Sequence, residues 1–128
     1  TKDAGLISFS KFKFNGTKLQ PIKIIGSSNR GNVFVVINAK EKSTLENVLF
    51  SNLSSSSDDY WSISGAVTFY ESPVVFKNCT FENNSSEDSL NLVRSKFEIK
   101  PFLASSGVLE DLISLNDQNT HLIAIEHQ

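Results

Sequence analysis

The sequence predicts an all-β fold, and three observations support this prediction. Apolar residues recur at every second position in short segments such as Ile22–Ile24 and Val67–Phe69, which is the period of a strand with one face buried. The segment Val33–Ile37 is apolar throughout, as in a strand covered on both faces. Serine and asparagine together make up a quarter of the chain and cluster between these segments, where turns are expected.

A short pattern occurs twice in the chain and predicts corners between successive strands. Residues 45–52 and 76–83 share the order apolar, charged, Asn, two further residues, Phe, polar, Asn. We expect a strand to end at the charged residue and Asn47 or Asn78 to adopt the left-handed conformation that most L-residues avoid. Counting back from Asn47 by about one repeat reaches Gly26, which is expected at the same corner because glycine also accepts this conformation.

The interval from Asn47 to Asn78 is longer than the interval from Gly26 to Asn47. The polar run at residues 54–61 accounts for the excess and is interpreted as a surface insertion. Corners at intervals of about 21–23 residues, with strands on both sides, are expected for a coil that has three short parallel strands in each turn, or rung.

The chain therefore resembles right-handed parallel β-helix proteins of the pectate-lyase-like class, in which corner asparagines stack as a ladder. Segments 61–74 and 86–95 are similar to a bacterial surface β-helix module of spore-coat-kinase-like proteins. The resemblance covers residues 5–99 and implies a repeat scaffold with an extracellular or cell-surface location and no assigned reaction. A compact β-sandwich built from the same strands is the alternative fold.

The pattern stops at Pro101, which lies about one repeat after Asn78, where the next corner is due. Proline cannot form a left-handed corner because its ring fixes φ at a negative value. Beyond it, residues 108–115 have apolar side chains at a helical spacing, and residues 121–126 resemble a strand. We expect about four rungs in residues 1–99, with residues 100–128 as a C-terminal cap over the open end of the coil. A short sheet edge contributed to something else is the alternative for residues 100–128.

Composition and charge limit the range of functions. The net charge of −2 and the pI near 5.6 give no electrostatic reason to expect nucleic acid or an anionic membrane as a partner, and no apolar run is long enough to insert into a membrane. Cys79 is the only cysteine and is predicted to be buried. No nucleophile elbow or phosphate-binding glycine loop occurs, so no cofactor is expected. His121, Glu126 and His127 are interpreted as solvated residues rather than metal ligands.

Two groups of residues are candidates for binding a polysaccharide. The first group is aromatic and consists of Tyr60, Trp61 and Tyr70. Trp61 ends the surface insertion, where its ring could stack on the apolar face of a sugar; packing against the insertion is the alternative. The second group is the densest polar set, which could line a groove for a uronate chain, with its arginine facing a carboxylate. A solvated face with a local arginine–acid pair is the alternative. This second group consists of Glu87, Asp88, Asn91 and Arg94.

The leading functional hypothesis is a non-catalytic extracellular scaffold or adhesion module, with glycan binding through the Trp61 insertion as an option. A polysaccharide lyase or epimerase-like fragment that uses Glu87, Asp88 and Arg94 is the second hypothesis. The third is a structural subunit of a fibre or larger assembly, whose open coil ends join another protein chain.

Overall fold

The computed structural model describes residues 5–27, 32–54, 65–85, 88–100, 114–115 and 121–126. These residues form strands and no helix. The first rung contains β1 (Leu6–Ser8), β2 (Lys13–Asn15) and β3 (Ile22–Ile25), and the second contains β4 (Phe34–Ile37), β5 (Ser43–Glu46) and β6 (Val48–Ser51). The third contains β7 (Gly65–Tyr70), β8 (Val74–Lys77) and β9 (Thr80–Glu82), the fourth contains β10 (Asp88–Val93), β11 (Phe97–Lys100) and β12 (Ser114–Leu115), and β13 (His121–Glu126) follows.

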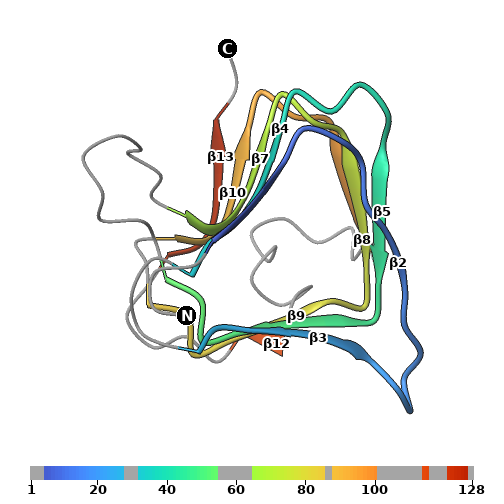
Figure 1. Ribbon diagram of the computed structural model, residues 1–128, viewed down its shortest axis with the longest axis vertical. Coiled ribbons are helices and arrows are strands. Elements are labelled where there is room, and N and C mark those ends of the chain that lie inside the picture. The colour runs from blue at the N-terminus through green and yellow to red at the C-terminus, as the bar shows by residue number, and fades with distance from the viewer. Residues whose placement is uncertain are drawn as a thin grey trace.

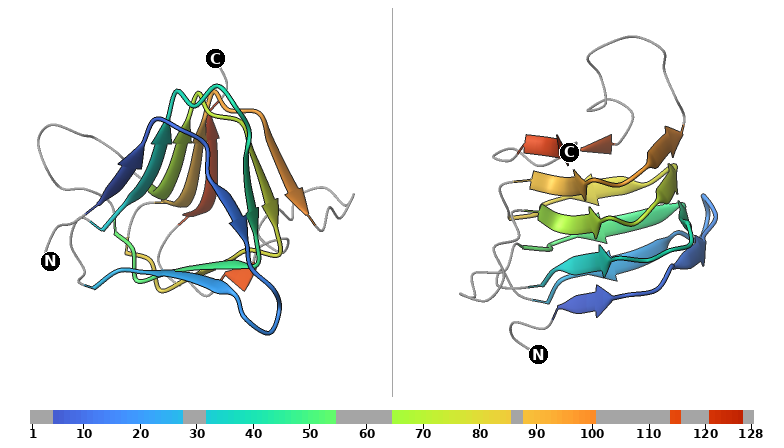
Figure 2. Two further views of the ribbon diagram at one scale, coloured as in Figure 1. Left: turned by 45° about the vertical axis from the view of Figure 1, so that its right-hand side comes forward. Right: turned by 90° about the horizontal axis from the view of Figure 1, so that it is seen from above.

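Every third strand is a neighbour in space, so the strands form three sheets. Sheet A has the order β1-β4-β7-β10-β13, sheet B the order β2-β5-β8-β11, and sheet C the order β3-β6-β9-β12. Each pairing between the described strands is parallel, which excludes the β-sandwich. The three sheets enclose a triangular cross-section (Figure 1), and the rungs stack in sequence order along the coil (Figure 2). The chain is a right-handed parallel β-helix, as the sequence predicted. It has four rungs and one additional strand, and the strand that completes the fourth rung, β12, lies beyond residues 1–99, in which the four rungs were expected.

The core lies inside the triangle and is rich in phenylalanine. Phe50 of β6 stacks on Phe81 of β9, with ring centroids 5.1 Å apart, because the strand register places them at the same position of successive rungs. Cys79 is buried, as expected. The apolar run around β4 is covered on both faces, since Phe34 and Val35 point to opposite sides and are 0% and 1% exposed.

A residue with positive φ directly follows every strand from β4 to β10. Asn47, with φ of 51°, separates β5 from β6, and Asn78, with φ of 53°, separates β8 from β9. Asn47 Nδ2 also donates a hydrogen bond of 3.1 Å to the carbonyl oxygen of Gly16 on the rung below. A left-handed residue reverses the direction of the pleat without a loop, so a new sheet can start at once. The remaining residues of this kind are Asn38, Asn52, Glu71, Asn83 and Arg94.

The prediction that Gly26 shares the corner of Asn47 is wrong. Ile25 is in register with Ser51, and the Gly26 amide donates to the Ser51 carbonyl over 2.9 Å, so Gly26 stacks on Asn52 after sheet C. Gly16 occupies the Asn47 corner instead, where an added Cβ would lie 2.5 Å from the Asn47 carbonyl oxygen. The interval from Gly16 to Asn47 equals the interval from Asn47 to Asn78, because the loop between β2 and β3 lengthens the first rung. The shorter interval from Gly26 to Asn47 was therefore measured between two corners that are not equivalent.

The described residues after position 100 extend the sheets. Ser114–Leu115 pairs with β9 and His121–Glu126 pairs with β10, both in parallel. The helical interpretation of residues 108–115 is therefore wrong at its last two residues, because apolar spacing over so short a segment does not distinguish a helix from a buried strand. The other residues of that stretch, and Pro101, lie outside the described residues.

Candidate functional site

The predicted polar set is only partly described by the structure. Tyr60, Trp61 and Glu87 lie outside the described residues, and Asp88 begins β10. Asn91 points out of the coil, because its neighbours Leu90 and Leu92 are both 0% exposed in the core. It is nevertheless only 5% exposed, so it offers little surface to a ligand.

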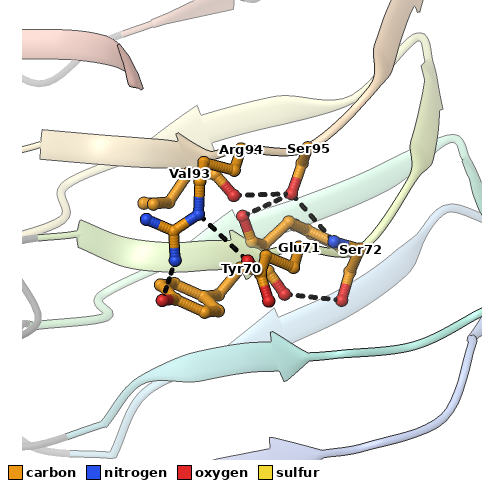
Figure 3. A network of polar contacts seen from close by, with 7 residues as sticks. Tyr70, Glu71, Ser72, Val93, Arg94 and Ser95 are labelled. Carbon is orange, nitrogen blue, oxygen red and sulfur yellow. Dashed lines mark hydrogen bonds and ion pairs between the residues drawn. The ribbon is translucent and has the colours of Figure 1, made fainter. Parts of the chain in front are cut away.

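Arg94 lies at the corner after β10, where a local acid and a tyrosine hold it (Figure 3). Its Nε forms an ion pair of 3.0 Å with Glu71 Oε1, and its Nη2 donates to the hydroxyl of Tyr70. The guanidinium carbon also lies 4.7 Å from the centroid of the Tyr70 ring, within range of a cation–π interaction. The structure thus shows a local arginine–acid pair, which was the alternative to a uronate-binding arginine.

The residues that follow Glu71 and Arg94 form a serine ladder, which sequence reasoning missed. The Ser72 amide donates to Ser95 Oγ over 3.0 Å, and the Ala39 amide donates to Ser72 Oγ over 3.0 Å. Each hydroxyl in turn donates to a carbonyl oxygen of sheet A. The available signal in the sequence was the Glu-Ser pair at 71–72 and the Arg-Ser pair one rung later at 94–95. These serines connect three successive rungs.

A buried asparagine has the same role at the corner after sheet C. Asn84 Oδ1 accepts a hydrogen bond of 2.9 Å from the Leu53 amide, and its Nδ2 donates to the Phe50 carbonyl oxygen over 3.4 Å. Buried Asn and Ser side chains thus bind the backbone of neighbouring rungs. These polar groups stabilise the stack.

The first rung carries an exposed apolar surface that sequence reasoning did not identify. Among the residues whose burial the structure describes, which leave out β12 and β13, the large hydrophobic side chains with substantial exposure all belong to residues 5–27. No described strand lies beneath β1, β2 or β3, which are the first strands of their sheets. Their inward side chains are therefore only partly buried, for example at Phe14. The exposed residues are Leu6 at 44%, Ile7 at 43%, Phe9 at 66%, Leu19 at 95% and Ile25 at 55%.

Two further features belong to this end of the coil. A pocket of about 300 Å³ opens between β1 and β3, and Leu6, Ile25 and Phe34 are among its lining residues. Residues 5–27 also contain four lysines and no aspartate or glutamate. Lys11 forms an ion pair with Glu41 of the second rung, whereas Lys13 and Lys23 are exposed on the outer faces of β2 and β3. We call this apolar and basic surface of residues 5–27, apart from the loop between β2 and β3 that contains Leu19, the first-rung surface.

The described residues show little sign of reactive chemistry. Burial raises the pKa of the Cys79 thiol from 9.0 to about 11, and its Sγ donates to the Leu45 carbonyl oxygen over 3.2 Å, so the thiol stays protonated and unreactive at neutral pH. Within the described ranges, no group of three His, Cys, Asp or Glu side chains is placed to hold a metal ion. The same residues contain no helix that is long and apolar enough to cross a membrane.

Comparison with known proteins does not extend this description. No family model matches the chain, and no curated protein or solved structure matches it either. The strand register and the corners therefore define its class, which is that of the parallel β-helix proteins.

Proposed function

We propose that the chain is a non-catalytic structural module of a larger assembly and that it joins its neighbour through the first-rung surface. One observation carries this proposal: among the side chains whose burial the structure describes, the exposed large apolar ones are concentrated on one rung of the coil. Contiguous exposed apolar surface marks interaction sites in soluble proteins. Unpaired strand edges at the same place can add a further strand through backbone hydrogen bonds.

The polar residues of the corners support a structural role. Ser72, Ser95 and Asn84 are buried, and their side chains bond to the backbone of adjacent rungs. Arg94 is held by Glu71 and Tyr70, so its charge is already paired with a carboxylate of the same corner.

Several expectations accompany this proposal as predictions. An extracellular or cell-surface location would suit a scaffold or adhesion module. Glycan binding through Tyr60 and Trp61 remains an option for the same module, and lyase or epimerase chemistry through Glu87, Asp88 and Arg94 remains the catalytic alternative.

Sedimentation velocity over a range of protein concentrations tests the proposed association. The double variant Leu6→Ser/Ile25→Ser removes two exposed apolar side chains that line the end pocket and should weaken association at least about tenfold, since fully burying one such side chain stabilises by about 1.5–3 kcal/mol. Leu19→Ser is the matched control, because Leu19 lies in the loop between β2 and β3, which projects away from the triangle (Figure 1). A wild-type chain that remains monomeric at millimolar concentration would refute the proposal.

A further inference from the structure

The outer face of sheet B carries most of the lysines in the described residues and, apart from β2, lies outside the first-rung surface. Leu45 and Phe76 are 0% exposed and point into the core, so the residues that alternate with them point out of the coil. The segments just before β2, β5 and β11 continue the same alternation. The lysines of this outer face are Lys11, Lys13, Lys42, Lys77, Lys96 and Lys100.

This face has a net positive charge, although the chain as a whole is negative. Its acidic residues are Glu46 of β5 and Glu98 of β11. The segment between β4 and β5 adds Lys40 and Glu41 at the edge of the face, and both are exposed. Seven lysines and three glutamates give a net charge of +4, whereas the whole chain has a net charge of −2. The fold therefore separates positive from negative charge.

Two ion pairs on this face do not cancel its charge. Lys11 pairs with Glu41, and Lys100 pairs with Glu98 over 3.2 Å. The four side chains are between 48% and 71% exposed, so solvent screens both pairs and they are weak. The excess of lysines remains available to an external anion.

The positions of the lysines favour a planar partner over a linear one. The strand register aligns outward residues in columns along the coil, and two such columns each contain a glutamate and at most two lysines. A linear polyanion laid along either column would meet a glutamate, whereas a charged plane interacts with the whole face. The two columns are Lys13, Thr44, Val75 and Glu98, and Asn15, Glu46, Lys77 and Lys100.

The chemistry of the outward side chains also restricts the partner. The outward positions of the four strands of sheet B include no arginine and no aromatic residue, which are the side chains on which single-stranded nucleic acids stack. None of the exposed large hydrophobic side chains in the described residues belongs to these strands, so the face has no anchor for insertion into hydrocarbon. It is suited to electrostatic contact alone.

We propose that the outer face of sheet B adsorbs to a membrane surface rich in anionic lipids, without inserting into it. Sheet B forms one side of the triangle (Figure 1), so the coil would lie with this side against the headgroups. Adjacent strands are about 4.8 Å apart and the Debye length at physiological ionic strength is about 8 Å, so the lysines of successive rungs act together. Each positive charge near an anionic leaflet strengthens binding about fivefold, which corresponds to about 1 kcal/mol.

The proposed adsorption goes beyond the proposed function, because it uses a different face of the coil. The net charge of the whole chain gave no reason to expect an anionic membrane as a partner. That net charge averages the basic face of sheet B with acidic residues elsewhere in the sequence.

Cosedimentation with vesicles tests the proposal, at a protein concentration low enough to keep the chain monomeric. The vesicles contain equal parts of phosphatidylglycerol and phosphatidylcholine, and vesicles of phosphatidylcholine alone are the neutral reference. The variant Lys42→Gln/Lys96→Gln removes two positive charges from the face and should weaken binding about 25-fold. Lys23→Glu is the matched control, because it changes the net charge by the same amount on the outer face of β3 in sheet C. Circular dichroism verifies that both variants are folded.

The wild-type chain should bind the anionic vesicles at physiological salt and not the neutral ones. It should be released at about 1 M salt, where the Debye length falls to about 3 Å. Absence of binding, or equal weakening by Lys23→Glu and by Lys42→Gln/Lys96→Gln, would overturn the proposal. Tighter binding per negative charge to polygalacturonate or single-stranded DNA would assign the face to a linear polyanion and overturn it as well. The proposed function stands or falls separately, because these variants leave Leu6 and Ile25 unchanged.

Discussion

The serine ladder makes a quantitative prediction about how the rungs are held together. Ser72 is 0% exposed, and its Oγ accepts the hydrogen bond of the Ala39 amide over 3.0 Å. Replacing Ser72 by alanine removes this acceptor. The backbone itself should tolerate the change, because Ala39 occupies the same column one rung earlier and is buried there.

The expected loss of stability follows from the groups left without partners. The Ala39 amide would be buried without an acceptor, which costs about 1–3 kcal/mol. The Tyr70 carbonyl oxygen, which accepts the Ser72 hydroxyl at 2.9 Å, keeps its bond to the Asn38 amide and adds little. At about 4 °C per kcal/mol for a chain of this size, the melting temperature should fall by about 4–12 °C.

Urea unfolding followed by circular dichroism measures the difference in the free energy of unfolding between Ser72→Ala and wild type. The protein concentration should be low enough to keep the chain monomeric. Ser85→Ala is the control, because Ser85 is exposed and its loss should change the free energy of unfolding by less than about 0.5 kcal/mol. If Ser72→Ala lowers the free energy of unfolding by no more than the control does, the serine ladder does not stabilise the stack.

Three further predictions concern the corner, the core and the buried thiol. Asn47→Ala should destabilise the chain by about 1–2 kcal/mol more than Asn47→Gly in urea unfolding, because both variants lose the bond to Gly16 but only alanine is strained at φ of 51°; equal losses would contradict this. Phe50→Ala should cost about 3–5 kcal/mol, since the ring is 0% exposed and stacked on Phe81, whereas a loss no larger than that of a surface substitution would mean the core is not closely packed. Cys79 has a folded pKa of about 11, above its ordinary value of 9.0, so the protonated thiol stabilises the fold below pH 9 and this contribution is lost as pH rises toward 11. Wild type should therefore lose about 1 kcal/mol more than Cys79→Ala between about pH 8 and pH 10, and parallel pH profiles would exclude this linkage.

The coil could be predicted from the sequence because the same pattern of residues occurs twice, one repeat apart. Residues 45–52 and 76–83 each combine a strand end, a corner asparagine and an inward phenylalanine, and these coincide in the structure. Glu71 and Arg94 could not be predicted as corners, because neither residue type favours positive φ. Both have φ of 46°, and backbone hydrogen bonds from the Asn38 amide to the Tyr70 carbonyl oxygen and from the Glu71 amide to the Val93 carbonyl oxygen connect this corner from rung to rung, which is a tertiary effect.

The candidate site was harder to predict for a related reason. The candidate residues were chosen from the sequence because polar and aromatic side chains can bind a ligand, and Asn91 and Arg94 were among them. Whether such residues are available depends on what packs against them, and the structure buries the first and pairs the second. The first-rung surface is exposed because no described strand lies below it. A local pattern of residues does not show whether such a strand is present, so this surface could not be predicted from the sequence.

One column of the core shows why the exposure of the first rung depends on position and not on residue type. Phe14, Leu45, Phe76 and Ile99 occupy equivalent positions of β2, β5, β8 and β11. The last three are between 0% and 2% exposed, whereas Phe14 is only partly buried. The first rung presents the same inward side chains as the others but has no described neighbour on one side, and its Phe14 is more exposed than Ile99 of the other end strand of sheet B, β11. A partner that covers it must therefore supply what each rung supplies to the next, namely parallel strands with apolar side chains directed to the axis.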